Sequence, residues 1–495
     1  MFLYIRMLIM MLLGLYTSRI VLEMLGINDY GIFNVVGGLV ALVSYINQAM
    51  SNSSIRYLTF SIGNPIKYSI NKVFNTTLIT HFLLAAIVLC LIETIGLWFL
   101  YNKLVIPECR MSTAFWVFQF SAIGTFLTII TIPYTAIIIA NERMSVFAYF
   151  TILDAVIKLG IALILSLSTG DRLELYGGLL LGTQILYLLM YFIYCVKHFS
   201  ECHLTMHTDK GLVKEILSFS GWSLVGCTAS ICNTQGLNIL LNLFGGPVLN
   251  AARGIAVQVQ SIVNNFAVNF QTAVNPQIIK LYARDSIPEL HMLIYRSAKF
   301  AFYLLYFICL PLLLNMNTVL HWWLVDVPDY TVVFLTLILI ITLLDSMSNP
   351  LMKAADATGK IRRYHLCVGG WLLLVLPVSY ILLNLGFPPY VVFIVQLIFS
   401  IGALFVRLFI LRNMIYMPII SYMRNVLLPV FLVVSVSLPL PLWVSTFDVH
   451  SSAVKFFGVC AICVISTIMS TFYLGMSPAE QAFLKSKILN RFVHK

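Results

Sequence analysis

Residues 13–62 read LGLYTSRIVLEMLGINDYGIFNVVGGLVALVSYINQAMSNSSIRYLTFSI and hold two apolar segments joined by a short turn. Arg19 lies near the end of the first segment, and Asn47, Gln48 and Arg56 follow the second. Charged residues in or beside lipid are costly, so they usually face a protein interior or a watery cavity. This stretch therefore predicts membrane-spanning helices with a cationic site that is reached from the membrane.

The composition extends this prediction to the whole chain. Of its 495 residues, 60% are hydrophobic and only 10% are charged, whereas a soluble domain is about half apolar and one quarter charged. A spanning helix needs about 20 apolar residues to cross a hydrocarbon core of roughly 30 Å. Segments of this kind recur along the chain as continuous runs, which favours helices over a β-barrel. The predicted fold class is an all-α polytopic membrane protein.

Fourteen spans are predicted, and their loops give an orientation. The spans are 3–24, 31–51, 73–98, 112–139, 146–168, 175–196, 219–244, 251–273, 299–322, 331–351, 365–385, 389–411, 425–446 and 453–474. Of the 30 basic residues, 22 lie in one set of loops and the tail, and 4 lie in the opposite set. Basic loops stay in the cytoplasm. The first set, which includes 51–73 and 407–425, and both termini are therefore predicted to be cytoplasmic.

Several classes of function are disfavoured. The formal charge of +11 lies mostly in loops, so membrane lipids explain it better than nucleic acid. The outer connections are too short for a catalytic domain, and no catalytic constellation is found, so an enzyme is not expected. The segment AADATGK at 354–360 lacks the first glycine and the final serine or threonine of a phosphate-binding loop. We expect no cofactor, no metal site and, from ten scattered cysteines, no disulfide framework.

Two neighbouring spans are rich in amides. The candidate residues of the first span are Asn233, Gln235 and Asn238, and those of the second are Gln258, Asn264 and Asn265. Lipid offers no hydrogen-bond partner to a side-chain amide. One interpretation is a hydrophilic cavity whose amides bind sugar hydroxyls, and the alternative is a set of hydrogen bonds between helices. The number of amides without accompanying charge favours the cavity.

Arg19, Arg56 and Arg253 are the cationic candidates. Arginine stays ionised, and its fork of donors matches phosphate oxygens. A cavity that holds such groups suits an anionic, diphosphate-like head group. The alternatives are an intrahelical pair of Arg19 with Glu23 and a plain cytoplasmic anchor at Arg56.

Acidic residues inside the spans are few. Asp154 and Lys158 stand at i and i+4, which favours an ion pair that reduces the cost of both charges. Asp345 is a lone acid followed closely by Pro350. It is either a site for proton or sodium coupling or a residue near a helix break. Asp154 and Lys158 are weaker coupling candidates.

Four segments resemble a known family. They are YTSRIVLEMLGINDYGIFNVVGG at 16–38, NQAMSNSSIRYL at 47–58, IPYTAIIIANERMSVFAY at 132–149 and ATGKIRRYH at 357–365. With the fourteen spans they resemble Wzx-type polysaccharide-biosynthesis flippases, in the superfamily that also holds multidrug exporters and lipid II flippases. The resemblance implies two pseudo-symmetric six-helix bundles forming a V around a central cavity, at 1–200 and 201–412, with two extra spans and a cytoplasmic tail at 413–495.

The resemblance also implies a function. Such proteins move undecaprenyl-diphosphate-linked oligosaccharide, an O-antigen or capsule repeat unit, from the inner to the outer leaflet of the bacterial inner membrane. Arg19, Arg56 and Arg253 would bind the diphosphate, and a polymerase and glycosyltransferases of the pathway would be partners. Relatives usually begin with a short basic leader, whereas here the first span starts almost at Met1, so the native start lies upstream or the leader is absent.

Three alternatives stay open. A multidrug or cation exporter of the same superfamily would need acidic and aromatic cavity residues, whereas the spans of this chain are poor in acids and carry arginines instead. A lipid II flippase binds a head group of similar charge and is hard to separate by sequence. A membrane oligosaccharide polymerase would be expected to carry a large outer loop, which is missing here.

Overall fold

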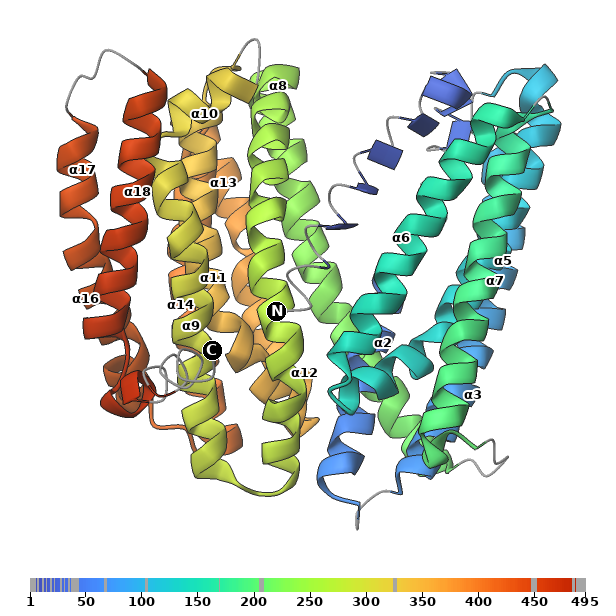
Figure 1. Ribbon diagram of the computed structural model, residues 1–495, viewed down its shortest axis with the longest axis horizontal. Helices are drawn as coiled ribbons and strands as arrows, with labels where there is room; N and C mark the ends of the chain where they lie inside the picture. Colours follow the sequence, from blue (N-terminus) through green and yellow to red (C-terminus); the bar gives the residue numbers. More distant parts are fainter. Residues whose placement is uncertain are drawn as a thin grey trace, which may run out of the picture. The chain divides into compact units, whose positions relative to one another are not determined.

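The computed structural model is all-helical in the part of the chain that it describes (Figure 1). It describes residues 6, 9–10, 13–14, 16–17, 20–21, 23–26, 29–30, 32–33, 36, 44–65, 69–102, 106–168, 170–203, 209–323, 327–446, 452–482 and 486. The chain divides into two compact units. Unit 1 comprises Met1–Thr228 and Ile279–Arg284, and unit 2 comprises Ala229–Ile278 and Asp285–Lys495.

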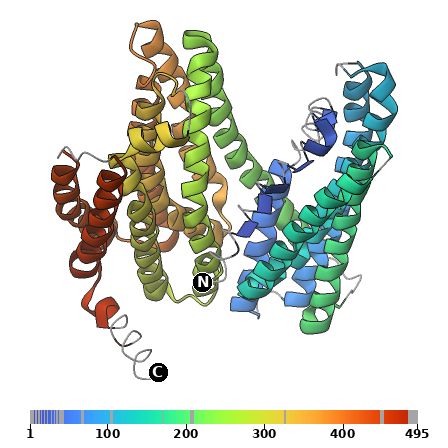
Figure 2. The ribbon, with the colours of Figure 1, turned by 45° about the horizontal axis from the view of Figure 1, so that its top comes forward.

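Unit 1 is built around helix α5. Its helices are α2 (Ser44–Gly63), α3 (Ile70–Leu91), α4 (Leu97–Asn102), α5 (Met111–Ala140), α6 (Met144–Leu167), α7 (Arg172–His198) and the start of α8 (Lys210–Ala283). α5 packs against α2, α3, α6 and α7, and Figures 1 and 2 show α6 running beside α7. Small residues of α5 such as Ala114, Ala122 and Gly124 are buried and let the neighbouring helices approach it.

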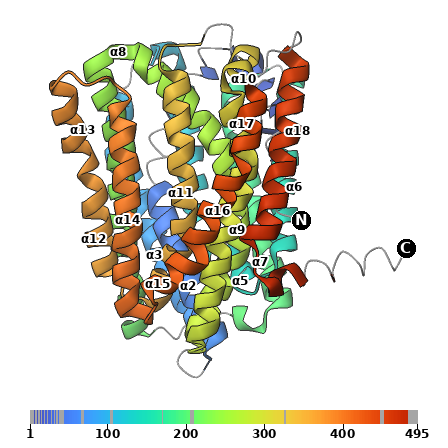
Figure 3. The same ribbon diagram turned by 90° about the vertical axis from the view of Figure 1, so that its left-hand side faces the viewer.

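Unit 2 has α11 at its centre. Its helices are the middle of α8, α9 (Ile287–Leu314), α10 (Met316–Trp323), α11 (Thr331–Thr358), α12 (Ile361–Leu373), α13 (Val375–Asn384), α14 (Val391–Ile415), α15 (Ile419–Tyr422), α16 (Leu428–Ser437), α17 (Pro439–Ser445) and α18 (Ser452–Ser470). α11 packs against α9, α12 and α14. The last helices, α16, α17 and α18, pack against one another and against α9 (Figure 3).

Helix α8 contains a reversal. Its residues are helical from Lys210 to Ala283, yet the Arg253 guanidinium bonds Asn238 and the carbonyl of Thr234. A straight helix rises 1.5 Å per residue, so Asn238 and Arg253 would stand roughly 22 Å apart along it. The chain must therefore fold back between them, near Gly245, where the sequence predicts the end of one span and the start of the next.

Within the described residues, eleven helices are long and apolar enough to cross a membrane, and each corresponds to one of the predicted spans. The span predicted at 251–273 is helical as the second arm of α8, but it is too polar to join the eleven. The predicted spans 3–24 and 31–51 fall largely outside the described residues. Large apolar side chains such as Phe82, Ile87 and Phe431 are exposed on these helices, as lipid-facing surfaces require. The chain is a multi-pass membrane protein.

In two of the predicted loops, helix extends further than the sequence predicts. The segment 51–73 is helical through Gly63, so Arg56 lies inside α2. The segment 407–425 begins inside α14, which continues to Ile415. In both places charged residues led to a prediction of loop, whereas the structure buries Arg56 and half-buries Arg407 against other helices.

Candidate functional site

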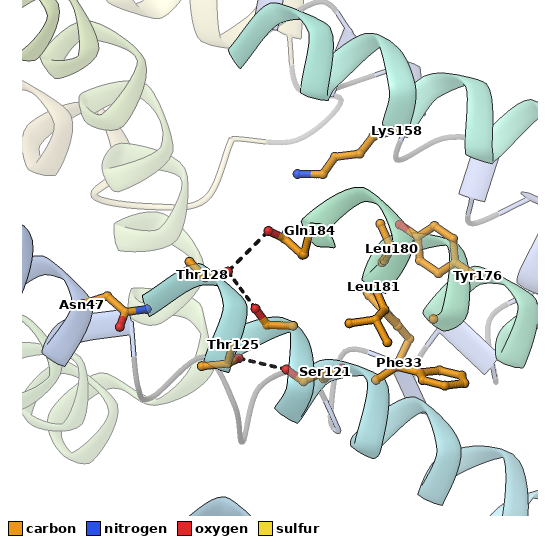
Figure 4. Close-up of a pocket in the computed structure, with 13 residues that line it drawn as sticks. Phe33, Asn47, Ser121, Thr125, Thr128, Lys158, Tyr176, Leu180, Leu181 and Gln184 are labelled. Atoms are coloured by element: carbon orange, nitrogen blue, oxygen red, sulfur yellow. Dashed lines mark hydrogen bonds between the residues drawn. The ribbon is translucent and has the colours of Figure 1, made fainter. Parts of the chain in front are cut away.

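A cavity of about 440 Å³ lies inside unit 1. Asn47 of α2, Lys158 of α6 and Gln184 of α7 line it together with a hydroxyl-bearing face of α5 (Figure 4). Phe33, Phe120 and Tyr176 contribute aromatic wall. Small-molecule sites are concave, largely apolar pockets of about 300–1,000 Å³ with a few convergent polar groups, and this cavity fits that description.

The polar wall of the cavity from α5 consists of Ser121, Thr125 and Thr128. Their spacing of i, i+4 and i+7 puts them on one helix face. Each hydroxyl donates to the carbonyl four residues earlier, with oxygen–oxygen distances of 2.8 Å for Ser121 and 2.9 Å for both threonines. A hydroxyl has one proton but can accept two hydrogen bonds. The three side chains therefore offer the cavity acceptors rather than donors.

Lys158 brings an ammonium group to the cavity. Its Nζ lies 2.7 Å from Oδ2 of Asp154, so the ion pair predicted from the i, i+4 spacing is confirmed. Gln184 accepts from the Thr128 hydroxyl at 3.4 Å through Oε1. The side-chain oxygen of Asn47 is buried without a hydrogen-bond partner among the described residues. The cavity is consequently close to electroneutral and rich in acceptors.

A second polar site lies in unit 2 around Arg253, which is only 5% exposed. Its guanidinium donates to Oδ1 of Asn238 and, at 3.0 Å, to the carbonyl of Thr234. Asn238 in turn donates to Oε1 of Gln235 at 3.1 Å. Nε of Arg253 has no partner, and no carboxylate pairs with it in the described part of the chain. Three of the predicted residues thus form one network that leaves the cation without a counter-ion.

Of the other amides predicted to line a cavity, one bonds to a neighbouring helix and three are exposed. Asn233 donates to the carbonyl of Leu372 at 3.4 Å, which is a bond between helices. Gln258, Asn264 and Asn265 are exposed. With Ser261, which is also exposed, Gln258 and Asn265 stand at i, i+3 and i+7 and form a polar stripe along α8. Lipid would leave these amides unsatisfied, so the stripe requires water or a polar partner.

Arg56 was predicted to bind an anion, and in the structure aromatic rings pack around it. It is 7% exposed, and its guanidinium carbon lies 4.3 Å from the ring centroid of Tyr57 and 5.4 Å from those of Phe60 and Phe219. Cations are attracted to aromatic faces at such distances, so the rings of unit 1 surround this charge. Gln48 is exposed on α2. Arg19 lies outside the described residues.

Asp345 is less isolated than the sequence indicates. On α11 it faces Ser400, which hydrogen-bonds it, and Arg407, both on α14. Arg407 donates through Nε to the hydroxyl of Tyr364 at 3.1 Å. The acid therefore belongs to a polar cluster that joins α11, α12 and α14 in unit 2. In the described part of the chain no three His, Cys, Asp or Glu side chains gather as a metal site.

Five residues of these sites were not predicted from the sequence: Ser121, Thr125, Thr128, Gln184 and Arg407. The i, i+4, i+7 spacing of the three hydroxyls was a readable signal, because a polar face on an otherwise apolar span points to the interior. Gln184 carried no such pattern. Arg407 was missed because it lies eight residues from the end of α14, where a basic residue is easily assigned to a loop.

Solved structures of other proteins share the fold of this chain. No family model matches the chain, and no curated protein matches it in sequence. Three similar solved structures are a point mutant of MATE, a multidrug resistance MATE family transporter of the MOP superfamily in an outward-facing conformation, and a MOP superfamily transporter from Pyrococcus furiosus. Their TM-scores are 0.73, 0.71 and 0.68, each at 14% identity and covering 84% of this chain and 95% of the other. The chain therefore has the fold of the MATE transporters of the MOP superfamily.

Proposed function

We propose that the protein is a flippase that moves undecaprenyl-diphosphate-linked oligosaccharide, an O-antigen or capsule repeat unit, from the inner to the outer leaflet of the bacterial inner membrane. The observation that carries this proposal is the Arg253 guanidinium, which is buried and lacks a carboxylate among the described residues. An uncompensated buried charge is costly. A diphosphate is the kind of anion that the guanidinium fork matches.

The polar stripe on α8 supports a path for the sugars. Carrying hydroxyls through hydrocarbon costs several kcal/mol for each group left without a partner. Exposed amides such as Gln258 and Asn265 offer such partners. In the proposed cycle of alternating access, the lipid tail stays in the bilayer while the head group crosses beside polar side chains.

Other parts of the proposal rest on the sequence. Arg19 and Arg56 would join Arg253 in binding the diphosphate, although the aromatic rings around Arg56 give it a packing role as well. Asp345, with Ser400 and Arg407 facing it, is the proposed group for coupling to H⁺ or Na⁺. Both termini would be cytoplasmic, and the pathway's polymerase and glycosyltransferases would be partners.

The main rival is a multidrug exporter, since a solved structure with this fold is described as a multidrug resistance transporter. An exporter of organic cations would expose acids in its site. The unit 1 cavity instead presents a lysine, and the Arg253 network is cationic. A lipid II flippase shares the diphosphate, and only the identity of the sugars separates it from the favoured function.

The test is the distribution of lipid-linked oligosaccharide between leaflets in cells with and without the intact protein. Accumulation of the intermediate on the inner side in cells without the protein, reversed when it is restored, is the expected result. An unchanged distribution accompanied by altered resistance to drugs would favour the exporter. Accumulation of peptidoglycan precursors and loss of viability would instead favour the lipid II flippase.

A further inference from the structure

We infer that the unit 1 cavity is a carbohydrate site that takes an uncharged, polyhydroxylated sugar unit of the transported head group. This inference deepens the proposed function, on which it rests, and it concerns a different place in the molecule from the diphosphate site at Arg253. The evidence for it is the set of hydrogen-bond donors and acceptors in the cavity wall, together with the charge of that wall.

The wall selects a ligand that donates hydrogen bonds. Ser121 and Thr125 donate their protons to backbone carbonyls of α5, and Thr128 shares its proton between the Gly124 carbonyl and Oε1 of Gln184. Asn47 also lines the cavity, but its amide oxygen is buried and does not count among the acceptors that face a ligand. Several acceptors that converge on one cavity match the neighbouring hydroxyls of a sugar, because each hydroxyl supplies one proton and still accepts.

Other residues of the lining supply donors and an apolar face. Figure 4 shows Gln184 between the Lys158 side chain and the hydroxyls of α5, so an ammonium and a side-chain amide can donate to ring or glycosidic oxygens. The ring of Tyr176 packs on Phe33 with centroids 5.0 Å apart. A largely apolar lining with a few orienting polar groups suits a pyranose, whose two faces carry C–H groups.

The charge of the cavity argues against ionic ligands. Among the described residues that line it, Lys158 is the one that carries a charge, so the lining presents no carboxylate that would attract an organic cation. The Asp154 carboxylate 2.7 Å from Nζ already neutralises this ammonium, so an acidic sugar would gain little attraction and would have to compete with Asp154. An uncharged sugar satisfies the acceptors without either cost.

The experiment uses the purified full chain in lipid nanodiscs and isothermal titration with three probes. The probes are maltose, a uronic-acid disaccharide of similar size, and tetraphenylphosphonium. The variant Thr125→Val with Thr128→Val removes two acceptors and keeps the side-chain shape. Thr135→Val is the matched control, because this hydroxyl on the same helix bonds the Ile132 carbonyl at 2.8 Å and does not line the cavity.

We expect the wild type and Thr135→Val to bind maltose alike, and the double variant to bind it roughly tenfold more weakly, as the loss of two neutral hydrogen bonds predicts. Melting temperatures establish that the variants are folded. Equal maltose binding by the double variant, no maltose binding by the wild type, or stronger binding of either charged probe would overturn the inference. The leaflet assay is a separate readout: sugar binding without flipping defeats the proposed function alone, and flipping without sugar binding defeats this inference alone.

Discussion

Lys158 in unit 1 and Arg253 in unit 2 carry the same charge in opposite settings. The Lys158 side chain is 38% exposed and has a carboxylate 2.7 Å away. Arg253 is 5% exposed, and its partners among the described residues are neutral oxygens of Asn238 and Thr234. Stability alone would give the counter-ion to the more buried cation, because its desolvation costs more. Stability therefore does not explain why Arg253, among the described residues, has neutral partners and no carboxylate.

The largest expected effect follows from replacing Arg253. In Arg253→Met, transfer of lipid-linked oligosaccharide to the outer leaflet should fall about 10–100-fold, the range expected for losing hydrogen bonds to a charged group. Arg253→Lys should fall less, because it keeps the charge and loses only the fork. The measurement is the outer-leaflet fraction, normalised to the amount of protein in the membrane.

Arg412→Met is the control for that series, since Arg412 is an exposed arginine in the last turn of α14. It should transport normally. If Arg253→Met transports as well as Arg412→Met, then the buried charge has no part in transport and the contrast with Lys158 loses its functional meaning.

The sequence predicts only in part the contrast between a paired Lys158 and an Arg253 with neutral partners. Composition and apolar run length predict the spans, because bilayer thickness dictates them directly, and the i, i+4 spacing predicts the Asp154–Lys158 pair because a helix brings such residues together. The neutral environment of Arg253 could not be predicted. It depends on the reversal of α8, which brings residues fifteen and nineteen positions apart into hydrogen-bond contact.

The residues that line the unit 1 cavity could not be predicted as neighbours either. Its residues come from α2, α5, α6 and α7, and only tertiary packing of these helices makes them neighbours. A periodic face such as Ser121, Thr125 and Thr128 indicates that α5 has a polar side, but not what faces it. Arg56 and Arg407 were assigned to loops because basic residues usually mark them, whereas aromatic rings surround one guanidinium and the Tyr364 hydroxyl accepts from the other.

A smaller effect is expected on stability when the ion pair of Lys158 with Asp154 is broken. Lys158→Met leaves Asp154 without its partner, so the protein should become less stable by roughly 1 kcal/mol, a modest value because solvent screens this half-exposed pair. The double variant Asp154→Asn with Lys158→Met removes both charges and should recover most of that loss. Thermal unfolding of the wild type, both single variants and the double variant gives the coupling directly. Additive losses would show that the pair is not a structural unit.

The smallest effect concerns a buried cation that does have a counter-ion. Lys299 of α9 is 6% exposed, and its Nζ lies 3.3 Å from Oε2 of Glu480, beyond the last spanning helix. Partial burial raises the pKa of Glu480, but the Ser477 backbone N–H and the Lys299 ammonium outweigh it and lower that pKa below its ordinary value. Its stabilisation is therefore complete above the pKa of the unfolded chain and is lost as pH falls through the lower folded value.

Glu480→Gln should therefore melt below the wild type at neutral pH, and the gap should close as the pH falls below about 4.5, near the ordinary pKa of a glutamate. Glu289→Gln, which changes an exposed acid in the first turn of the same α9, is the control for removing a carboxylate from this helix pair. A gap that stays constant with pH would mean that the charge of Glu480 does not stabilise the fold. Lys299 would then be a second buried cation held by neutral groups such as the Gly475 carbonyl at 3.2 Å, and the absence of a counter-ion would no longer set Arg253 apart.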